Sequence, residues 1–341
     1  MDPRLAFPSS LLGRPPLELL SPAPRHGRSR VDLMWHDGRL GWRGPTPADG
    51  SSWSIAPPDA AVIETLDAAL PAFIAAYEAS APPHGPAQVR LRVAPDGRRG
   101  AWIDLSRAGL TLLLEEGHWL AGRLADGWVI EVGQRGEGVV AGVDGSVLSD
   151  AISAVWLPGR DARGEEVPLM STVASFTQPG PAINTALLAA AGRLLDDAGL
   201  ATSPWSEWGS GYGNLTAWLA SRVGPDGRAF ELDARSRRLL ARNAAAHFPS
   251  VRLDHVPSTP GEEKAELLVI DPPRPGFGKE LAALAEAPGR PCRVLAFHCD
   301  TRGLEADARA LAGGNYTPRA WLAVDAFPGT RFLEVVSLWE R

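Results

Sequence analysis

Cysteine is scarce in this chain of 341 residues, which has only Cys292 and Cys299. Two cysteines exclude a scaffold of several disulfides and exclude a site in which four cysteines hold zinc or an iron–sulfur cluster. They could form one disulfide, but such low use fits a reducing cytoplasm at least as well. The sequence therefore predicts no metal site and favours a cytoplasmic location.

Long apolar runs and an excess of positive charge are also missing. No run approaches the roughly 18 consecutive apolar residues of a membrane-spanning helix, and the N-terminus lacks the basic start and apolar core of a signal peptide. We therefore expect no membrane association. The formal net charge is −6, from 34 basic and 40 acidic residues. This balance argues against a protein that coats nucleic acid by bulk charge, although a local basic patch remains possible.

What is present is enough apolar sequence for a globular core, since 45% of the residues are hydrophobic and 22% are charged. The length suggests two domains at about 150 residues each. Residues 1–168 are irregular and proline-rich up to about residue 30 and then alternate between apolar and polar residues in short runs, which is the pattern of strands. One helix is expected from Asp59 to Glu78, with a break or kink at Pro71. We predict a β-rich α+β domain here.

Residues 169–341 instead alternate strands with helices, which predicts a mostly parallel sheet with helices on both faces. Helices are expected over Asn184–Ala198, with Gly199 as the C-cap, and from Ala234 to about His247. The last two strands are joined by only a few residues, so we expect them to pair in an antiparallel hairpin. The sequence does not define an oligomeric state, and a monomer is the simplest expectation.

Ligands of such sheets bind where the parallel strands end, and the first candidate feature at that edge is a glycine-rich turn. Glu207 opens this stretch, and Gly211 and Gly213 would let the backbone approach a ligand closely. Glu231 ends the next strand, where a carboxylate can accept the two hydroxyls of a ribose. Nucleoside binding is the interpretation that we favour, the alternative being an ordinary glycine turn. The stretch has no G-K-[ST] and is not a P-loop.

Three further residues fall at the same edge. Asp271 begins a D-P-P-R turn directly after an apolar strand, where it is typical of a methyltransferase site or, alternatively, of a rigid turn. Cys299 follows the next strand and could be a nucleophile if its pKa is lowered, or simply a small buried apolar residue. Glu334 opens the final, antiparallel strand, so it can face the same cleft and accept a proton, unless it is an ordinary surface glutamate.

Taken together, these motifs resemble the RNA (uracil-5-)-methyltransferase family, which uses S-adenosylmethionine. The resemblance covers about residues 28–341 and is specific in the second half. The family's closing D-x-F-P-x-T-x-x-x-E pattern stands at residues 325–334, and its F-x-Q segment stands at Phe176-Thr177-Gln178. The resemblance implies a Rossmann-like class I methyltransferase domain over 169–341. In that fold a seven-stranded, mostly parallel sheet has an antiparallel last strand. The N-terminal half, 1–168, is similar to the family's RNA-contacting domain.

The resemblance also implies a role for each candidate residue. Cys299 would add to C6 of a uridine in tRNA or rRNA, C5 would then take the methyl group, and Glu334 would remove the C5 proton. The target base would be extruded from its stack. The implied cofactor-binding residues are Gln178, Glu207, Gly211, Gly213, Glu231 and Asp271, and the implied substrate-binding residues are Gln178, Asp271 and Arg274.

The chain departs from the family pattern beside the nucleophile and in the first core strand. Asp300 and Thr301 follow Cys299 where the family has asparagine and proline, and we expect the extra carboxylate to raise the thiol pKa. The first core strand is polar, with Glu207 in the place of the usual aspartate. Two alternatives therefore stay open. One is a catalytically altered or inactive relative that binds RNA, and the other is a methyltransferase acting on another substrate.

Overall fold

A computed structural model describes residues 2–21, 28–43, 55–56, 64–82, 85–105, 128–134, 137–140, 149–150, 153–200, 203–255, 265–326 and 332–341. The chain divides into two compact units that are each discontinuous in sequence. Unit 1 comprises residues 1–23, 158–169 and 182–341, and unit 2 comprises residues 24–157 and 170–181. The boundary between residues 168 and 169, which we drew for two domains, stays a prediction.

Unit 1 is built on an eight-stranded sheet in the order β1-β17-β18-β16-β15-β12-β13-β14. Every pairing in it is parallel except the two made by β18, which lies antiparallel between β16 and β17. The strands are β1 (Leu19–Leu20), β12 (Trp205–Trp208), β13 (Gly227–Phe230), β14 (Arg252–Asp254), β15 (Leu267–Ile270), β16 (Arg293–His298), β17 (Thr317–Val324) and β18 (Glu334–Glu340). A two-stranded hairpin of β10 (Gly159–Arg160) and β11 (Glu166–Val167) is separate from this sheet.

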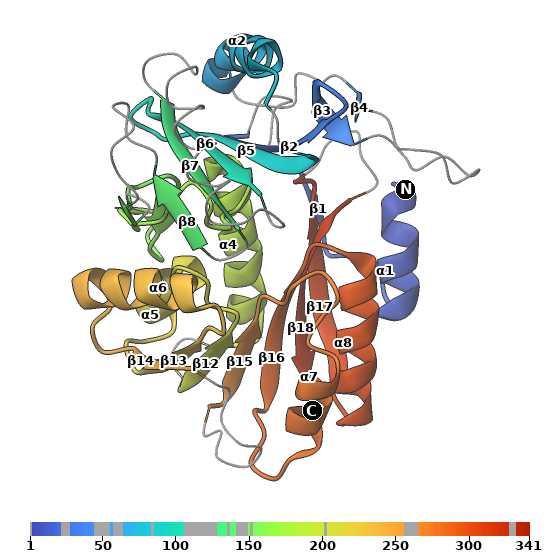
Figure 1. Cartoon of the computed structure of the whole chain (residues 1–341). Coiled ribbons are helices and arrows are strands. Elements are labelled where there is room, and N and C mark those ends of the chain that lie inside the picture. The colour runs from blue at the N-terminus through green and yellow to red at the C-terminus, as the bar shows by residue number, and fades with distance from the viewer. Residues whose placement is uncertain are drawn as a thin grey trace. The chain divides into compact units, whose positions relative to one another are not determined.

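Helices cover both faces of this sheet (Figure 1). One face packs on α4 (Pro181–Asp197), α5 (Asn214–Arg222) and α6 (Ala234–His247). The other packs on α1 (Ala6–Leu11), α7 (Lys279–Glu286) and α8 (Thr301–Gly313), with a short helix η1 (Pro3–Leu5) leading into α1. Strand β15 shows why both layers form, because Leu267 and Val269 join one core while Leu268 and Ile270 join the other. The predicted doubly covered, mostly parallel sheet with an antiparallel last strand is confirmed, but it has eight strands rather than seven because β1 joins its edge.

Unit 2 contains a second eight-stranded sheet, in the order β4-β3-β2-β5-β6-β7-β8-β9, in which only β6 and β7 are parallel. Its strands are β2 (Arg30–His36), β3 (Arg39–Arg43), β4 (Ile55–Ala56), β5 (Ala87–Val93), β6 (Arg99–Asp104), β7 (Trp128–Gln134), β8 (Glu137–Val140) and β9 (Ser149–Asp150). Helix α2 (Glu64–Ser80) packs on this sheet through a shared apolar core. The β-rich α+β prediction is therefore confirmed.

The expected break at Pro71 is wrong, because α2 runs through that residue. A proline inside a helix costs about 3 kcal/mol, since it removes one backbone hydrogen bond. Here the proline is exposed, while Leu66, Leu70, Phe73 and Tyr77 form a buried stripe at helical spacing. Burial of each such side chain contributes about 1.5–3 kcal/mol, which outweighs the lost bond.

Four elements of unit 1, in two regions of the chain, were not predicted. Residues 1–30 were expected to be irregular, yet η1 and α1 place Leu5 and Leu12 in the core, and β1 adds a strand to the sheet edge. Arg4 also donates two hydrogen bonds to the Asp325 carboxylate, at 2.8 and 2.9 Å. Helix α5, directly after the glycine-rich turn, was also missed. Among the described residues, no helix is long and apolar enough to cross a membrane.

Candidate active site at the strand ends of unit 1

The residues singled out in the second half of the chain gather at one edge of the unit 1 sheet. In the parallel register, Trp208 at the end of β12 aligns with Phe230 of β13 on one side and with Ile270 of β15 on the other. The residues that leave these strands are therefore neighbours. They carry the glycine turn, Glu231 and Asp271, in the region where open α/β sheets bind their ligands.

The glycine-rich turn has a backbone that only glycine adopts without strain. Gly209, Gly211 and Gly213 have φ values of 82°, 58° and 103°. A Cβ atom at Gly209 would lie 2.5 Å from the carbonyl oxygen of Asp271, whereas the space beside Gly211 is open. The turn is fastened by Glu231, whose carboxylate accepts hydrogen bonds from the N–H groups of Gly211 and Asp233, at 2.7 Å each. The result is a fixed turn with an open side at Gly211.

Glu207 is fully buried within β12, and only one of its two carboxylate oxygens is hydrogen-bonded among the described residues. One carboxylate oxygen accepts a hydrogen bond of 2.6 Å from Thr216 Oγ1, while Oε1 has no hydrogen-bond partner among the described residues. The pKa of this carboxyl is raised to about 8, first by burial and then by the charges of Asp271 and Glu231, against the lowering effect of the Thr216 hydrogen bond. A buried oxygen without a partner is costly, so this group is set up to meet something that the protein itself does not supply.

Asp271 carries a second perturbed carboxyl. Burial, followed by the charge of Glu231, raises its pKa to about 7. Arg274, three residues further along the same turn, is exposed. Perturbed carboxyls that cluster at a sheet edge mark a functional site more often than a structural one, because a purely structural acid is normally paired.

Cys299 and Glu334 meet at the same edge. His298 pairs with Val335 across the antiparallel β16–β18 ladder, so the residue after His298 and the residue before Val335 lie at the same end of both strands. Cys299 is partly exposed and Glu334 is buried. Burial, then Glu334 and Asp271, raise the pKa of the Cys299 thiol to about 12, while the Arg274 charge opposes this rise.

The thiol pKa is raised, as expected, but Asp300 is not among the main causes of that rise. The Asp300 carboxylate caps α8 by accepting a hydrogen bond of 2.9 Å from the N–H of Arg302, and it also pairs with the Arg302 guanidinium at 3.2 Å. These contacts lower the pKa of Asp300, and the charges that raise the thiol pKa come from Glu334 and Asp271 instead. The N-cap function explains the residue type, since aspartate is among the best caps.

Gln178 lies in unit 2, on the segment 170–181, so its place beside the other candidates stays a prediction. Within unit 2 this segment is fastened by arginines of two strands. Arg30 donates to the carbonyl of Thr177 at 2.6 Å, Arg90 donates to that of Ala174 at 2.6 Å, and Arg92 donates to that of Ser175. Phe176, with 61% of its surface exposed, lies under the Arg30 guanidinium at 5.0 Å.

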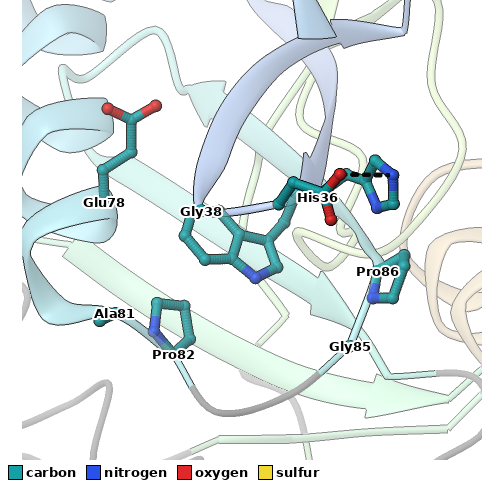
Figure 2. A pocket seen from close by; sticks show the side chains of 9 residues that line it. His36, Gly38, Glu78, Ala81, Pro82, Gly85 and Pro86 are labelled. Carbon is teal, nitrogen blue, oxygen red and sulfur yellow. Dashed lines mark ion pairs between the residues drawn. The ribbon is translucent and has the colours of Figure 1, made fainter. Parts of the chain in front are cut away.

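Unit 2 also has a pocket of about 350 Å³ between the β2–β3 turn, the end of α2 and the residues Ala81, Pro82, Gly85 and Pro86. Figure 2 shows Glu78 and His36 on its walls. Glu78 accepts a hydrogen bond of 2.9 Å from the N–H of Leu40, and His36 pairs with Asp37 at 3.3 Å. Among the described residues that line this pocket there is no cysteine.

The structure adds two residues that our sequence reasoning did not consider, His298 and Asp307. Both are buried, and they contact each other at 3.1 Å beside Cys299. The signal available in the sequence was a histidine in an apolar strand, directly before the candidate nucleophile. No group of three or more potential metal ligands occurs within the described ranges.

Comparisons with known proteins bear on this site. The chain matches no protein-family model. It is 29% identical, over 99% of its length and 86% of the relative, to the uncharacterized RNA methyltransferase Bd2056 of Bdellovibrio bacteriovorus. It is 35% identical to the 23S rRNA (uracil(1939)-C(5))-methyltransferase RlmD of Thiobacillus denitrificans, over 49% of this chain but only 40% of that relative.

Among solved structures, the chain resembles the Pyrococcus abyssi tRNA (uracil-54, C5)-methyltransferase in complex with S-adenosyl-L-homocysteine. The TM-score is 0.64 at 16% identity, over 98% of this chain and 81% of the other. This likeness shows a shared fold. The chain is therefore similar in sequence to RNA methyltransferases, among them an RNA (uracil-5-)-methyltransferase, and it shares the fold of another.

Proposed function

We propose that this protein transfers a methyl group from S-adenosylmethionine to C5 of a uridine in RNA, through a covalent adduct between Cys299 Sγ and C6 of the base. The observation that carries the proposal is the end of the β16–β18 ladder, where Cys299 and Glu334 lie next to each other. A nucleophile beside a carboxylate is what the two halves of this reaction need. One group attacks C6 and the other removes the proton from C5.

The residues at the strand ends fit the cofactor. The turn leaves open space beside Gly211, Glu231 is fastened where it can face ribose hydroxyls, and Glu207 keeps a buried oxygen without a partner among the described residues. Glu207 and Asp271 are carboxyls with raised pKa values, and a cationic ligand favours their ionised forms. S-adenosylmethionine, when bound, supplies an electrophilic methyl group on a cationic sulfonium.

The chain's own residues would then act in sequence. The Cys299 thiol loses its proton to solvent, and its thiolate adds to C6, which makes C5 nucleophilic. After C5 has taken the methyl group, the Glu334 carboxylate accepts the C5 proton, the bond between Sγ and C6 breaks, and the thiolate is released. Arg274 opposes the two carboxylates that disfavour the thiolate, and it can also contact the RNA backbone.

The decisive experiment uses RNA that contains 5-fluorouridine, because a C5 fluorine cannot leave as a proton and the adduct then persists. We expect a complex of protein and RNA that withstands denaturing electrophoresis and forms only with the cofactor present. Cys299→Ala should abolish it, and Cys292→Ala, which changes an exposed cysteine, should preserve it. If RNA is methylated while neither protein nor variant forms an adduct, the covalent mechanism is incorrect.

The target is proposed only as tRNA or rRNA. Mass-spectrometric mapping of 5-methyluridine in both RNA classes, with and without this protein, decides between them. If 5-methyluridine does not change at any position while another methylated nucleoside does, the alternative of a methyltransferase with a different substrate replaces the proposal.

A second candidate function is that of an RNA-binding relative without turnover. A thiol pKa of about 12 is the observation that favours it, because such a thiol is almost entirely protonated at neutral pH. Calorimetry separates the two functions. An active enzyme binds S-adenosylmethionine at a stoichiometry of one, whereas a relative that has lost activity along with its cofactor site binds RNA alone.

Three accompanying proposals concern the setting of the reaction. We infer that the protein works in the cytoplasm, with RNA as its partner, and as a monomer. Sedimentation equilibrium gives the oligomeric state directly, and a mass of twice 36.2 kDa would overturn the monomer.

A further inference from the structure

A buried histidine–aspartate pair includes the residue directly before the proposed nucleophile in the sequence. His298 is the last residue of β16, Asp307 belongs to α8, and their exposed fractions are 3% and 0%. His298 Nε2 lies 3.1 Å from Asp307 Oδ2. A carboxylate in the interior costs several kcal/mol unless its oxygens are bonded, so the other oxygen should also have a partner.

That other oxygen is bonded to the turn that carries Asp271 and Arg274. Asp307 Oδ1 accepts hydrogen bonds from the N–H groups of Phe277, at 2.8 Å, and Gly278, at 2.7 Å. One carboxylate therefore joins three elements: the end of β16, the helix α8 and the end of the 271–278 turn.

Close backbone packing holds the same turn against α8. A Cβ atom at Gly276 would lie 2.8 Å from Asp307 Oδ1, and one at Gly303 would lie 2.6 Å from the carbonyl oxygen of Arg274. Contacts this short leave no room for a side chain at either glycine. The turn therefore has one position on α8, and Asp307 bonds to it there.

We propose that the His298–Asp307 pair is a positioning device that holds the 271–278 turn, and with it Arg274, beside Cys299. His298 is the residue before Cys299, and Arg274 lies three residues before Phe277, so the pair connects the chain segments that carry the thiol and the cation. Neither residue of the pair is a catalytic residue. The pair's relevance to methyl transfer rests on the proposed function, but its effect on the thiol does not.

The test measures the alkylation of Cys299 by iodoacetamide at pH 8.5, with neither RNA nor cofactor, in a Cys292→Ser background. The alkylation rate follows the thiolate fraction, which changes tenfold for each unit of pKa. Arg274→Gln should slow alkylation about threefold to tenfold, because it removes the cation that favours the thiolate. Asp307→Asn should slow it in the same direction, and the double variant should be no slower than the slower single variant.

The sign of the Asp307→Asn effect distinguishes positioning from simpler causes. Loss of a negative charge near the thiol would by itself favour the thiolate, and a loosened turn would expose the sulfur. Both causes speed alkylation, and only displacement of Arg274 slows it. Unchanged or faster alkylation in folded Asp307→Asn, or independent effects that multiply in the double variant, would overturn the proposal.

Two further variants keep the proposal testable if Asp307→Asn does not fold. His298→Leu leaves Oδ2 without its partner and should slow alkylation. His298→Gln, whose amide can donate to the same oxygen, should restore the wild-type rate. Glu305→Gln is the matched control on α8, since Glu305 pairs with Arg309 on the exposed side of the helix, and it should have no effect. If methyl transfer fails while these alkylation effects are found, the proposed function is wrong and the positioning device stands.

Discussion

Two buried glutamates show how a structural acid differs from one at a binding edge. Glu131 in unit 2 and Glu207 in unit 1 are both fully buried on strands. The two oxygens of Glu131 accept hydrogen bonds from the N–H groups of Val173 and Ala174, at 2.9 Å each. Glu207 has a hydroxyl on one oxygen and no hydrogen-bond partner for Oε1 within the described residues.

The two carboxylates differ in how many of their oxygens have hydrogen-bond partners. Glu131 bonds to its own chain and thereby fastens the segment 170–181 to β7. Burial and the neighbouring carboxylates raise the pKa of Glu207. A buried carboxylate whose oxygens are both hydrogen-bonded contributes to the stability of the protein. One with an unbonded oxygen lowers that stability, and a ligand that bonds to this oxygen restores it.

The largest expected effect concerns Glu334, which the proposed function uses as a base. Glu334→Gln should lower kcat for uridine methylation by about 10²–10⁴-fold, because an amide cannot accept the C5 proton. The measurement is methyl transfer to RNA under saturating substrate. Glu340→Gln, at the other end of β18 and paired with Arg293, is the control and should retain full activity. Equal losses in both variants would point to damage to the strand rather than loss of a base.

The same substitution in the two buried glutamates should act in opposite ways. Glu131→Gln should lower the free energy of unfolding by about 2–3 kcal/mol, because an amide NH₂ would face a buried N–H that loses its acceptor. Glu207→Gln should leave the ligand-free protein as stable at pH 7 or more so, since a carboxyl with a pKa of about 8 is already mostly protonated there. Urea unfolding measures both variants. A large destabilisation by Glu207→Gln would contradict our account of this edge.

A smaller effect is expected in the pH dependence of stability. Glu207 and Asp271 have pKa values of about 8 and about 7 in the folded protein, above those of the unfolded chain. Between about pH 5 and pH 8 the folded state therefore binds more protons, so the free energy of unfolding should fall as pH rises. The slope is at most about 1.4 kcal/mol per pH unit for each group.

Urea unfolding across this range, for the wild-type protein and for Glu207→Gln/Asp271→Asn, checks the assignment. The double variant should flatten the profile. The lowered pKa of Asp32, which pairs with Arg30 and Arg90, acts only below about pH 4 and so lies outside the window. A wild-type profile that rises from pH 5 to pH 8 would refute the raised pKa values.

Much of the fold could be predicted because the spacing of apolar residues along the chain indicates many of its strands and helices. The strands β2, β5, β6 and β7 and the helices α4 and α6 follow from period-2 and period-3.6 spacing of apolar residues. The errors came where a longer-range contact decided the outcome. The helix through Pro71 depends on a stripe of buried side chains, and the N-terminal elements depend on the core and the sheet edge that they meet.

In the candidate site, too, some features could be predicted from the sequence and others could not. Asp271, Cys299 and Glu334 could be placed at one edge because a residue at a strand end keeps its place whatever the loops do. The partners of each side chain could not be predicted. Asp300 looked like a charge acting on the thiol and is a helix cap, and Asp307 showed no pattern at all although it bonds to both His298 and the 271–278 turn.

The sequence by itself determined the order of strands and helices, the carboxylates and cysteine at strand ends, and the family resemblance, because these depend on neighbours along the chain. Tertiary structure decided which buried oxygens have partners, in which direction each pKa moves, and that the N-terminal elements between residues 3 and 20 pack with the C-terminal half. Hydrogen bonding and desolvation are set by atoms far apart in sequence. They therefore become defined only when the chain has folded.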